Sequence, residues 1–365
     1  MGQGIAWIGR RGIGGASMHR AIVFACLLGA LLGGVGCATR LGRPPVEPEA
    51  VEAERREQKK LALTLLLERQ SRVWALGNRI RRAGAELCGE ETRQTFGFFA
   101  VDAATLRPDL REVTAEVGLG PGVSIWSVSE GFPVAAEQLR RGDRIVAIAG
   151  REVRDLGGFE RAMVGPFETG QLSMEIERPA GERLEVALEG ALACDYRVGL
   201  LEDDRVNALA DGKNVLVTSG MLRFTESDDE LALVVGHELA HNALGHLKQQ
   251  RAQVLAGLLV DLAIAVFGGV DTGGLFAKLG AIVYSEEMEA DADYMGLYFS
   301  ARADYAIEGA PLFWRRMAVE HPGSIEENML ATHPSYPERA VAISRTIEEI
   351  ETKRRDGLPL VPEPR

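Results

Sequence analysis

The sequence predicts an α+β fold, in which a mainly helical body with a small β-sheet carries an inserted β-rich domain. Residues 49–86 and 226–250 show the helical spacing of apolar and charged side chains. Residues 118–190 instead consist of short β-branched runs separated by glycine turns, the pattern of a β-rich segment. Because this segment lies between helical segments, we expect it to be an insertion.

The composition limits the class of protein. The chain has 365 residues, which is enough for two or three domains with separate cores. Hydrophobic residues make up 46% and charged residues 26%, so the chain is globular rather than disordered. The formal net charge of -12 disfavours a nucleic-acid partner, because phosphate binding needs a basic face. A protein or peptide partner is compatible with this charge.

The N-terminal segment predicts export. A basic start at Met18 precedes the apolar run of residues 21–36, so we expect residues 1–36 to be a signal peptide whose true start is Met18. The run ends in GGVGC, which resembles the lipobox of bacterial lipoproteins, although Gly34 stands where that pattern usually has leucine. The resemblance implies that Cys37 is lipidated. A plain cleaved signal and a retained membrane helix are the alternatives.

The remaining cysteines fit an exported protein. Residues 37–48 hold the lipidated cysteine and a Pro-rich tether. Cys26 lies in the signal peptide, which leaves Cys88 and Cys194 as an even pair in an oxidising compartment. We expect a disulfide between them, closing a loop of about 100 residues and stabilising the fold by roughly 4 to 5 kcal/mol. Two unrelated buried thiols are the alternative.

Residues 49–110 should supply a long helix and a strand (95–102) to the helical body, before the β-rich domain of residues 115–190. That domain resembles a PDZ domain, with a Gly-x-Pro turn at Gly131, then Gly142-Asp143 and a strand at 145–148. The resemblance implies that an extended peptide binds beside a helix. Its carboxylate-binding loop is expected near residues 118–120, where Pro121 lacks a backbone donor. Peptide binding and a structural or gating role are both compatible with this pattern.

The chemistry-bearing motif is VVGHELAHNALGH, residues 234–246. A capping box of Ser227 and Glu230 starts the helix, on which His237 and His241 lie one turn apart and can bind one metal ion. Glu238 is placed to take a proton from a water molecule that the metal acidifies, as in the HExxH motif. At 100° per residue, His246 points about 180° away from His237. We therefore predict that His246 is structural or faces solvent.

A third ligand is expected in YSEEMEADADYMG, residues 284–296. Glu289 and Asp293 lie four apart on a second predicted helix, so Glu289 can complete a His-His-Glu set while Asp293 orients a ligand imidazole. From the residues alone, other acids on this helix compete for the ligand role. These are Glu286, Glu287 and Asp291.

Three motifs in order carry a family resemblance. They are residues 206–246 (VNALADGKNVLVTSGMLRFTESDDELALVVGHELAHNALGH), YSEEMEADADYMG and ATHPSYPERAV. Together they resemble the zinc metallopeptidase family of HtpX, BepA and the type I CAAX prenyl proteases, over residues 195–345. The resemblance implies a zincin-type (gluzincin) catalytic domain at residues 194–350, with one Zn²⁺ held by His237, His241 and Glu289, and with Asp293 behind them.

The resemblance also implies roles for other segments. His333 and Arg339 would stabilise the oxyanion on the substrate side of the site, although His333 could instead cap a helix. Two strands around the Asp211–Gly212 turn would lie beside the active helix, where zincins bind substrate as an added strand. Residues 254–284 are apolar but are broken by Asp261 and by glycine pairs, so we expect a helical hairpin beside the site.

We therefore expect a zinc metalloendopeptidase that hydrolyses misfolded or envelope polypeptides. The protein would be anchored through Cys37 and would face the periplasm. The residue after Cys37 is Ala38 rather than aspartate, which favours the outer membrane in a Gram-negative host. A peptide ligand is expected for the PDZ-like domain, and residues 351–365 form a tail. The competing class is a PDZ-containing periplasmic chaperone or adaptor with a structural or closed metal site.

Overall fold

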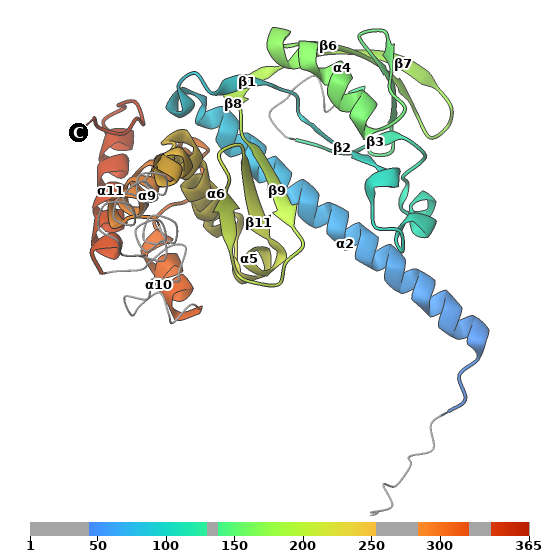
Figure 1. Cartoon of the computed structure of the whole chain (residues 1–365), viewed down its shortest axis with the longest axis horizontal. Coiled ribbons are helices and arrows are strands. Elements are labelled where there is room, and N and C mark those ends of the chain that lie inside the picture. Colours follow the sequence, from blue (N-terminus) through green and yellow to red (C-terminus); the bar gives the residue numbers. More distant parts are fainter. Residues whose placement is uncertain (1–43, 130–137, 253–283, 321–336, 365) are drawn as a thin grey trace, which may run out of the picture. The chain divides into compact units, whose positions relative to one another are not determined.

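A computed structural model describes residues 44–129, 138–252, 284–320 and 337–364 of the chain (Figure 1). The predicted signal peptide, Cys37, the Gly131 turn, His333 and nearly all of the expected hairpin lie outside these residues. The chain forms two units, Met1–Ala53 and Glu54–Arg365, and all contacts described below lie within the second. Among the described residues, no helix has the length and apolarity needed to span a membrane.

The longest helix, α2 (Pro48–Ala83), supplies apolar side chains to two cores. Leu63, Leu66 and Leu67 pack in a cluster with Trp126 and the segment that follows β2. Further towards the C-terminal end of α2, Val73, Leu76 and Ile80 pack in the main core of the helical body. The three-and-four spacing of these residues places them on one helix face, so α2 is common to the β-rich part and the helical part.

A six-stranded antiparallel sheet forms the β-rich domain, with strand order β2-β3-β4-β6-β7 and β5 paired to β4. Helix α4 (Leu156–Thr169) begins at an Asp155 cap, whose side chain accepts from the Gly158 backbone N–H. In β6 and β7 buried and exposed residues alternate, because one face covers the domain core. The strands are β2 (Phe98–Asp102), β3 (Val123–Val128), β4 (Arg144–Ile148), β5 (Arg151–Glu152), β6 (Gln171–Glu177) and β7 (Arg183–Glu189).

One expected boundary is wrong. The strand at residues 95–102 was assigned to the helical body, but β2 pairs with β3 and lies at the edge of the six-stranded sheet. Phe96 and Phe98 belong to the core of this sheet. The β-rich domain therefore starts before residue 98 rather than at 115. Three short 3-10 helices follow β2: η2 (Ala103–Thr105), η3 (Arg111–Val113) and η4 (Ala115–Val117). Another, η1 (Ala85–Cys88), follows α2 before the domain begins.

The two ends of the β-rich domain lie side by side. Strand β1 (Thr92–Thr95) pairs antiparallel with β8 (Ala191–Cys194), and these strands precede and follow the domain in the chain. Cys88 and Cys194 form a disulfide next to this ladder, with their Cα atoms 5.6 Å apart. The entry and exit of the domain are thus fixed to each other by hydrogen bonds and by a covalent bond.

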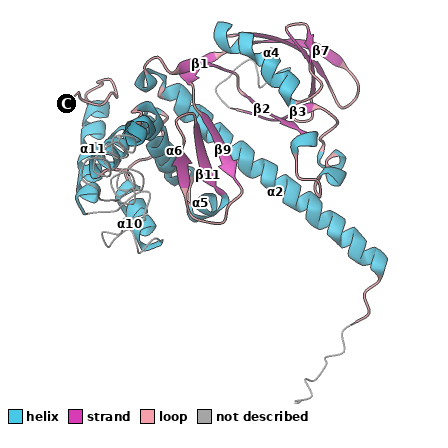
Figure 2. Ribbon diagram, viewed as in Figure 1, coloured by secondary structure: helices cyan, strands magenta, loops and turns pink. Residues whose placement is uncertain are grey.

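The helical body contains a three-stranded mixed sheet and a group of helices (Figure 2). In this sheet β11 pairs antiparallel with β10 and parallel with β9. The strands are β9 (Arg197–Leu201), β10 (Ala208–Ala210) and β11 (Asn214–Thr218). The helices are α5 (Ser219–Phe224), α6 (Asp228–Ala243), α9 (Glu286–Arg302), α10 (Ala310–Glu320) and α11 (Pro337–Arg355). The predicted mixture of helix and sheet is confirmed.

Candidate metal centre

Helix α6 starts where its sequence predicts. The Ser227 side chain accepts a hydrogen bond from the Glu230 backbone N–H at 3.2 Å, which satisfies a donor that the helix leaves free. The second half of the predicted capping box differs, because the Glu230 carboxylate accepts from the Glu226 backbone N–H and not from that of Ser227. All residues from Leu231 to Asn242 are buried, so α6 runs through the core of the body.

Helix α9 has its own serine cap. The Ser285 side chain accepts from the Met288 backbone N–H at 3.2 Å, and the helix then places Glu289 and Asp293 one turn apart. Both carboxylates are buried, Glu289 completely. A buried hydrogen bond from the Ser300 hydroxyl to the Ala232 carbonyl, 2.9 Å long, joins α9 to α6.

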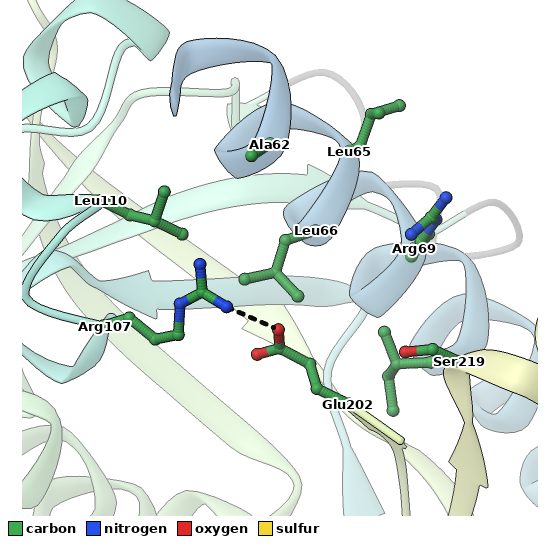
Figure 3. A pocket seen from close by; sticks show the side chains of 9 residues that line it. Ala62, Leu65, Leu66, Arg69, Arg107, Leu110, Glu202 and Ser219 are labelled. Atoms are coloured by element: carbon green, nitrogen blue, oxygen red, sulfur yellow. Dashed lines mark ion pairs between the residues drawn. The ribbon is translucent and has the colours of Figure 1, made fainter. Parts of the chain in front are cut away.

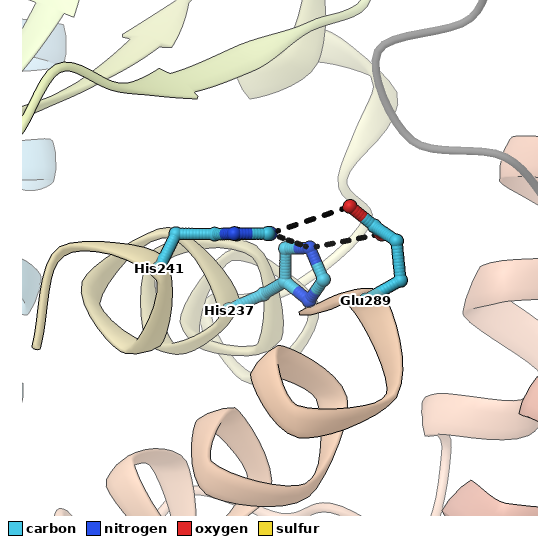
Figure 4. Close-up of side chains that lie close together, drawn as sticks. All are labelled: His237, His241 and Glu289. Atoms are coloured by element: carbon cyan, nitrogen blue, oxygen red, sulfur yellow. Dashed lines mark hydrogen bonds and ion pairs between the residues drawn. The ribbon is translucent and has the colours of Figure 1, made fainter. Parts of the chain in front are cut away.

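Three donor atoms from these two helices converge (Figure 4). The Nε2 atoms of His237 and His241 are 3.0 Å apart, and they lie 3.5 and 3.4 Å from the two carboxylate oxygens of Glu289. A tetrahedral Zn²⁺ with bonds of 2.0–2.2 Å needs ligand atoms separated by roughly 3.4 Å. Two imidazole nitrogens and one carboxylate oxygen therefore fit Zn²⁺ in chemistry and in spacing, and three protein ligands leave a fourth position open.

The outer nitrogen of His237 is held by a carboxylate. His237 Nδ1 lies 3.0 Å from Asp293 Oδ1, so Nδ1 carries the hydrogen and Nε2 is directed at the donor cluster. Burial lowers the pKa of His237, but hydrogen bonds and charges from Asp293 and Glu289 outweigh burial and raise it above its usual value. Without metal this imidazole therefore holds an extra proton, which a metal ion must displace.

Arg339 binds the two carboxylates of α9. Its Nε and Nη2 donate to the two oxygens of Asp293 at 2.7 and 2.8 Å, and its Nη1 lies 3.1 Å from Glu289 Oε2. Its side chain is only 6% exposed. The guanidinium of this residue on α11 neutralises the two buried carboxylates that face the histidines, and its role towards the oxyanion stays a prediction. Its charge helps hold the pKa of Asp293 below the usual value, against the effect of burial.

His246 is a buried, structural residue, but its side chain does not point away from the site as the helical spacing predicts. It is buried, with 3% of its surface exposed, and its Nδ1 lies 2.9 Å from His241 Nδ1. The extrapolation along one helix fails because α6 ends at Ala243 and the chain turns at Gly245, which has φ +69°. A new helical segment starts at residue 246 and returns this imidazole to His241.

Two aromatic side chains that the sequence did not single out flank the histidines. The Tyr284 ring stacks on His241 with centroids 4.1 Å apart, and the Trp314 ring lies 5.2 Å from His237. Burial, with added repulsion from Glu238 and Glu289, raises the pKa of Tyr284 to about 12. The signal for Tyr284 is its place directly before the Ser285 cap. Trp314 lies on α10, outside every motif, and no local signal marks it.

Glu238 is buried beside His237 on α6, with 3% of its surface exposed.

Asn242, the residue after His241, ties α6 to the strand hairpin. Its Oδ1 accepts from the Gly212 N–H at 2.7 Å, and its Nδ2 donates to the Asn214 carbonyl at 3.1 Å. A pocket of about 370 Å³ reaches from this hairpin to His241. Of the three candidate ligand residues, His241 alone lines this pocket.

A second cavity, of about 210 Å³, lies on α2 and contains none of the ligand residues (Figure 3). Leu65 and Leu66 line it together with Leu110, and an ion pair of Arg107 with Glu202, 3.5 Å apart, crosses its edge. This pocket is mostly apolar and is separate from the metal centre.

A buried His-His-Glu set with an open fourth position, carried by an HExxH helix beside a small mixed sheet, defines a metallopeptidase centre. Residues 166–347 match peptidase family M48, so the chain contains a peptidase M48 domain. Zn²⁺ is the cofactor of the family.

Curated relatives are similar to part of this chain. The beta-barrel assembly-enhancing protease of Yersinia pestis is 30% identical over 169 residues, which cover 42% of this chain and 35% of that protein. Metalloprotease LoiP of Escherichia coli (strain K12) is 29% identical over 153 residues, covering 40% of this chain and 60% of LoiP. The mitochondrial metalloendopeptidase OMA1 of Danio rerio is 28% identical, covering 47% of this chain and 39% of OMA1. The chain thus spans between about a third and three fifths of these relatives.

A solved structure is also similar to part of this chain. The HtrA3 PDZ domain bound to a phage-derived ligand (FGRWV) is 18% identical, with a TM-score of 0.22, and the match covers 28% of this chain and 88% of that chain. A TM-score this low carries no argument about the fold. The PDZ-like assignment of the six-stranded sheet stays a prediction.

Proposed function

We propose that this chain is a zinc-dependent metalloendopeptidase of the bacterial cell envelope, which cleaves misfolded or envelope polypeptides. The observation that carries the proposal is the convergence of His237, His241 and Glu289 on one buried point beside Glu238. The names of the bacterial relatives, a beta-barrel assembly-enhancing protease and a metalloprotease, support the substrate class and the location.

The proposed roles follow from the chemistry of the side chains. When bound, Zn²⁺ would supply a Lewis acid that polarises the scissile carbonyl and acidifies water. Glu238 is the general base, which takes the proton of the attacking water and passes it to the leaving amine. Asp293 holds the His237 ring in the ligand orientation, and Arg339 holds Asp293 in turn.

Substrate binding is proposed along the small sheet. Strand β10 lies at the edge of the order β10-β11-β9 and packs on α6. An unpaired strand edge offers backbone donors and acceptors to an extended peptide, so a polypeptide can add as a further strand beside the metal centre. Asn242 fixes the turn of this hairpin to the helix that carries the histidines.

The remaining assignments are also proposals. We propose that Cys37 carries the lipid anchor and places the protein at the outer membrane, facing the periplasm. The six-stranded domain is proposed as a PDZ-like module with a peptide ligand. Mass spectrometry of the protein from a Gram-negative host tests the anchor: acylation of Cys37 supports it, and an unmodified Cys37 in the mature chain contradicts it.

The central experiment measures proteolysis. Purified zinc-loaded protein should cleave unfolded casein, and both a chelator and Glu238→Gln should abolish cleavage, because the first removes the Lewis acid and the second removes the base. Glu238→Gln keeps the size of the side chain, so its zinc content should match that of the wild type. Full cellular function of the Glu238→Gln variant would contradict proteolysis as the role and would point to an adaptor.

A further inference from the structure

Each of the two ligand histidines has a partner on the nitrogen that faces away from the donor cluster. For His237 the partner is the carboxylate of Asp293 on α9, 3.0 Å away. For His241 the partner is the imidazole of His246, whose Nδ1 lies 2.9 Å from His241 Nδ1. Both contacts are made by the Nδ1 atom of a ligand histidine. They differ in chemistry, because one partner is an anion and the other is an imidazole.

The direction of the hydrogen bond follows from the ligand role of His241. Its Nε2 faces the cluster, 3.4 Å from Glu289 Oε1, so this nitrogen must offer a lone pair to a metal ion. A neutral imidazole then has its hydrogen on Nδ1. His241 Nδ1 therefore donates, and His246 accepts at Nδ1 and carries its own hydrogen on Nε2.

The turn after α6 brings this acceptor into place. The Leu244 N–H still bonds to the Ala240 carbonyl, but Gly245 has φ +69° and interrupts the helical backbone. The imidazole of His246 then meets His241 edge to face, with ring centroids 5.0 Å apart, while Tyr284 stacks on the His241 ring at 4.1 Å. The His241 ring is thus held by an aromatic face and by an acceptor for its outer N–H.

We propose that His246 is a positioning residue that fixes the tautomer and the ring orientation of the metal ligand His241. This inference rests on the proposed zinc centre. His246 is not a ligand itself, because its near nitrogen faces the side of His241 that points away from Nε2 of His237 and from Glu289. Acceptors on the outer nitrogen of a ligand histidine raise its basicity and lock its direction, and their loss typically lowers metal affinity about 10- to 100-fold.

The first test needs no mutation. In zinc-loaded full-length protein with ¹⁵N-labelled histidine, NMR should show His241 with its hydrogen on Nδ1 and His246 with its hydrogen on Nε2. A scalar coupling across the hydrogen bond should join the two Nδ1 nuclei. A His246 whose hydrogen is on Nδ1, or an absent coupling with zinc bound, overturns the proposal.

The second test measures zinc affinity by competition with a chelator. His246→Phe keeps a ring beside His241 but removes the acceptor, so its zinc affinity should fall about 10-fold or more. His246→Asn places an amide oxygen near the position of Nδ1, and should retain zinc affinity within about threefold of the wild type. Unchanged affinity in His246→Phe contradicts the proposal. Thermal unfolding of the metal-free variants checks that both are folded, and if His246→Phe is not, the NMR measurement decides.

A third variant separates this inference from the function on which it rests. His241→Ala removes a ligand and should abolish stoichiometric zinc binding. If the wild type and His241→Ala bind zinc equally weakly, the proposed metal centre itself fails. If the wild type binds tightly, His241→Ala does not, and His246→Phe binds like the wild type, the metal centre stands and the positioning role of His246 fails.

Discussion

Gly236 of α6 and Gly296 of α9 lie against each other where the two helices of the metal centre cross. A Cβ on Gly236 would be 2.5 Å from the Gly296 carbonyl oxygen, and a Cβ on Gly296 would be 2.8 Å from the backbone nitrogen of His237. Neither position has room for a side chain, because the obstacle is backbone. The close crossing places Glu289 within reach of the two histidines.

Replacing Gly296 by alanine should therefore disturb both the fold and the site. Separating two packed helices to admit a methyl group typically costs about 1–3 kcal/mol. Zinc affinity should fall as well, because Glu289 moves away from the His237 and His241 nitrogens. Urea unfolding measures the first effect, and a competition titration with a zinc chelator measures the second.

Gly157→Ala in α4 is the matched control. A Cβ at this helical position would meet the far end of the flexible Arg161 side chain at 3.3 Å and the Asp155 carboxylate at 3.4 Å, with no backbone in the way. Alanine is a better helix former than glycine, so this variant should be as stable as the wild type or gain up to about 1 kcal/mol. Equal losses of stability in both variants would contradict the explanation that Gly296 is needed for the close approach of α6 and α9.

The position of Arg339 predicts an effect that depends on the metal. Arg339→Met removes the guanidinium that faces the buried carboxylates of Asp293 and Glu289 and leaves them only protonated His237 as a cation, which should cost the metal-free protein up to about 3–5 kcal/mol. A bound zinc ion returns positive charge to Glu289, so the loss should be smaller in the zinc-loaded protein. Urea unfolding with and without zinc compares the two losses.

A double variant tests whether the loss comes from this ion pair. Asp293→Asn removes the charge that Arg339 neutralises, so adding Arg339→Met to it should cost less than Arg339→Met costs alone. Additive losses would contradict the pairing. A metal-free Arg339→Met protein as stable as the wild type would show that the guanidinium does not stabilise these carboxylates.

The disulfide between Cys88 and Cys194 should contribute strongly to stability. Its cysteines are 106 residues apart in the sequence. It joins the segment that enters the β-rich domain to the segment that leaves it. The chain-entropy model gives about 4.7 kcal/mol for a loop of roughly this length. Replacing both cysteines by alanine should lower the free energy of unfolding by about 2–5 kcal/mol. A reductant should destabilise the wild type and leave the double variant unchanged, and equal effects on both would contradict this account.

Features encoded in a few neighbouring residues were predictable. The serine cap of α6 was predicted and is confirmed, because the side chain bonds to a backbone N–H three residues further on. The HExxH spacing required only that residues 237–241 be helical, and α6 includes them. Such features depend on local geometry, so the sequence is sufficient to predict them.

Features that depend on distant packing were not predictable. The position of His246 required knowing that α6 ends at Ala243, since one positive φ at Gly245 changes the direction of everything after it. The sheet to which β2 belongs is decided by its pairing with β3, more than twenty residues away. Arg339 meets Asp293 only because α11 packs on α9, and nothing near either residue encodes that contact.

That packing of α11 on α9 includes a half-buried carboxylate whose charge can be tested. The Glu349 carboxylate on α11 accepts hydrogen bonds from the hydroxyls of Tyr294, at 2.8 Å, and of Tyr298. Burial alone would raise the pKa of Glu349. The tyrosine hydrogen bonds, together with Lys353 at 3.5 Å, outweigh burial and lower this pKa below its usual value of 4.5. Ionised Glu349 is therefore favoured in the folded state.

A lowered folded-state pKa fixes the sign of the pH dependence. Ionised Glu349 contributes its stability above the unfolded-state pKa, and this contribution is lost as pH falls through the lower folded-state pKa. Metal-free wild type should therefore be more stable than Glu349→Gln at about pH 7, and the difference should shrink towards about pH 3. Urea unfolding at both pH values measures the difference in the free energy of unfolding between the two proteins. The contributions of the other carboxylates cancel in this difference, because both proteins contain them. A difference of the same size at both pH values would show that the tyrosines and Lys353 do not favour the ionised form.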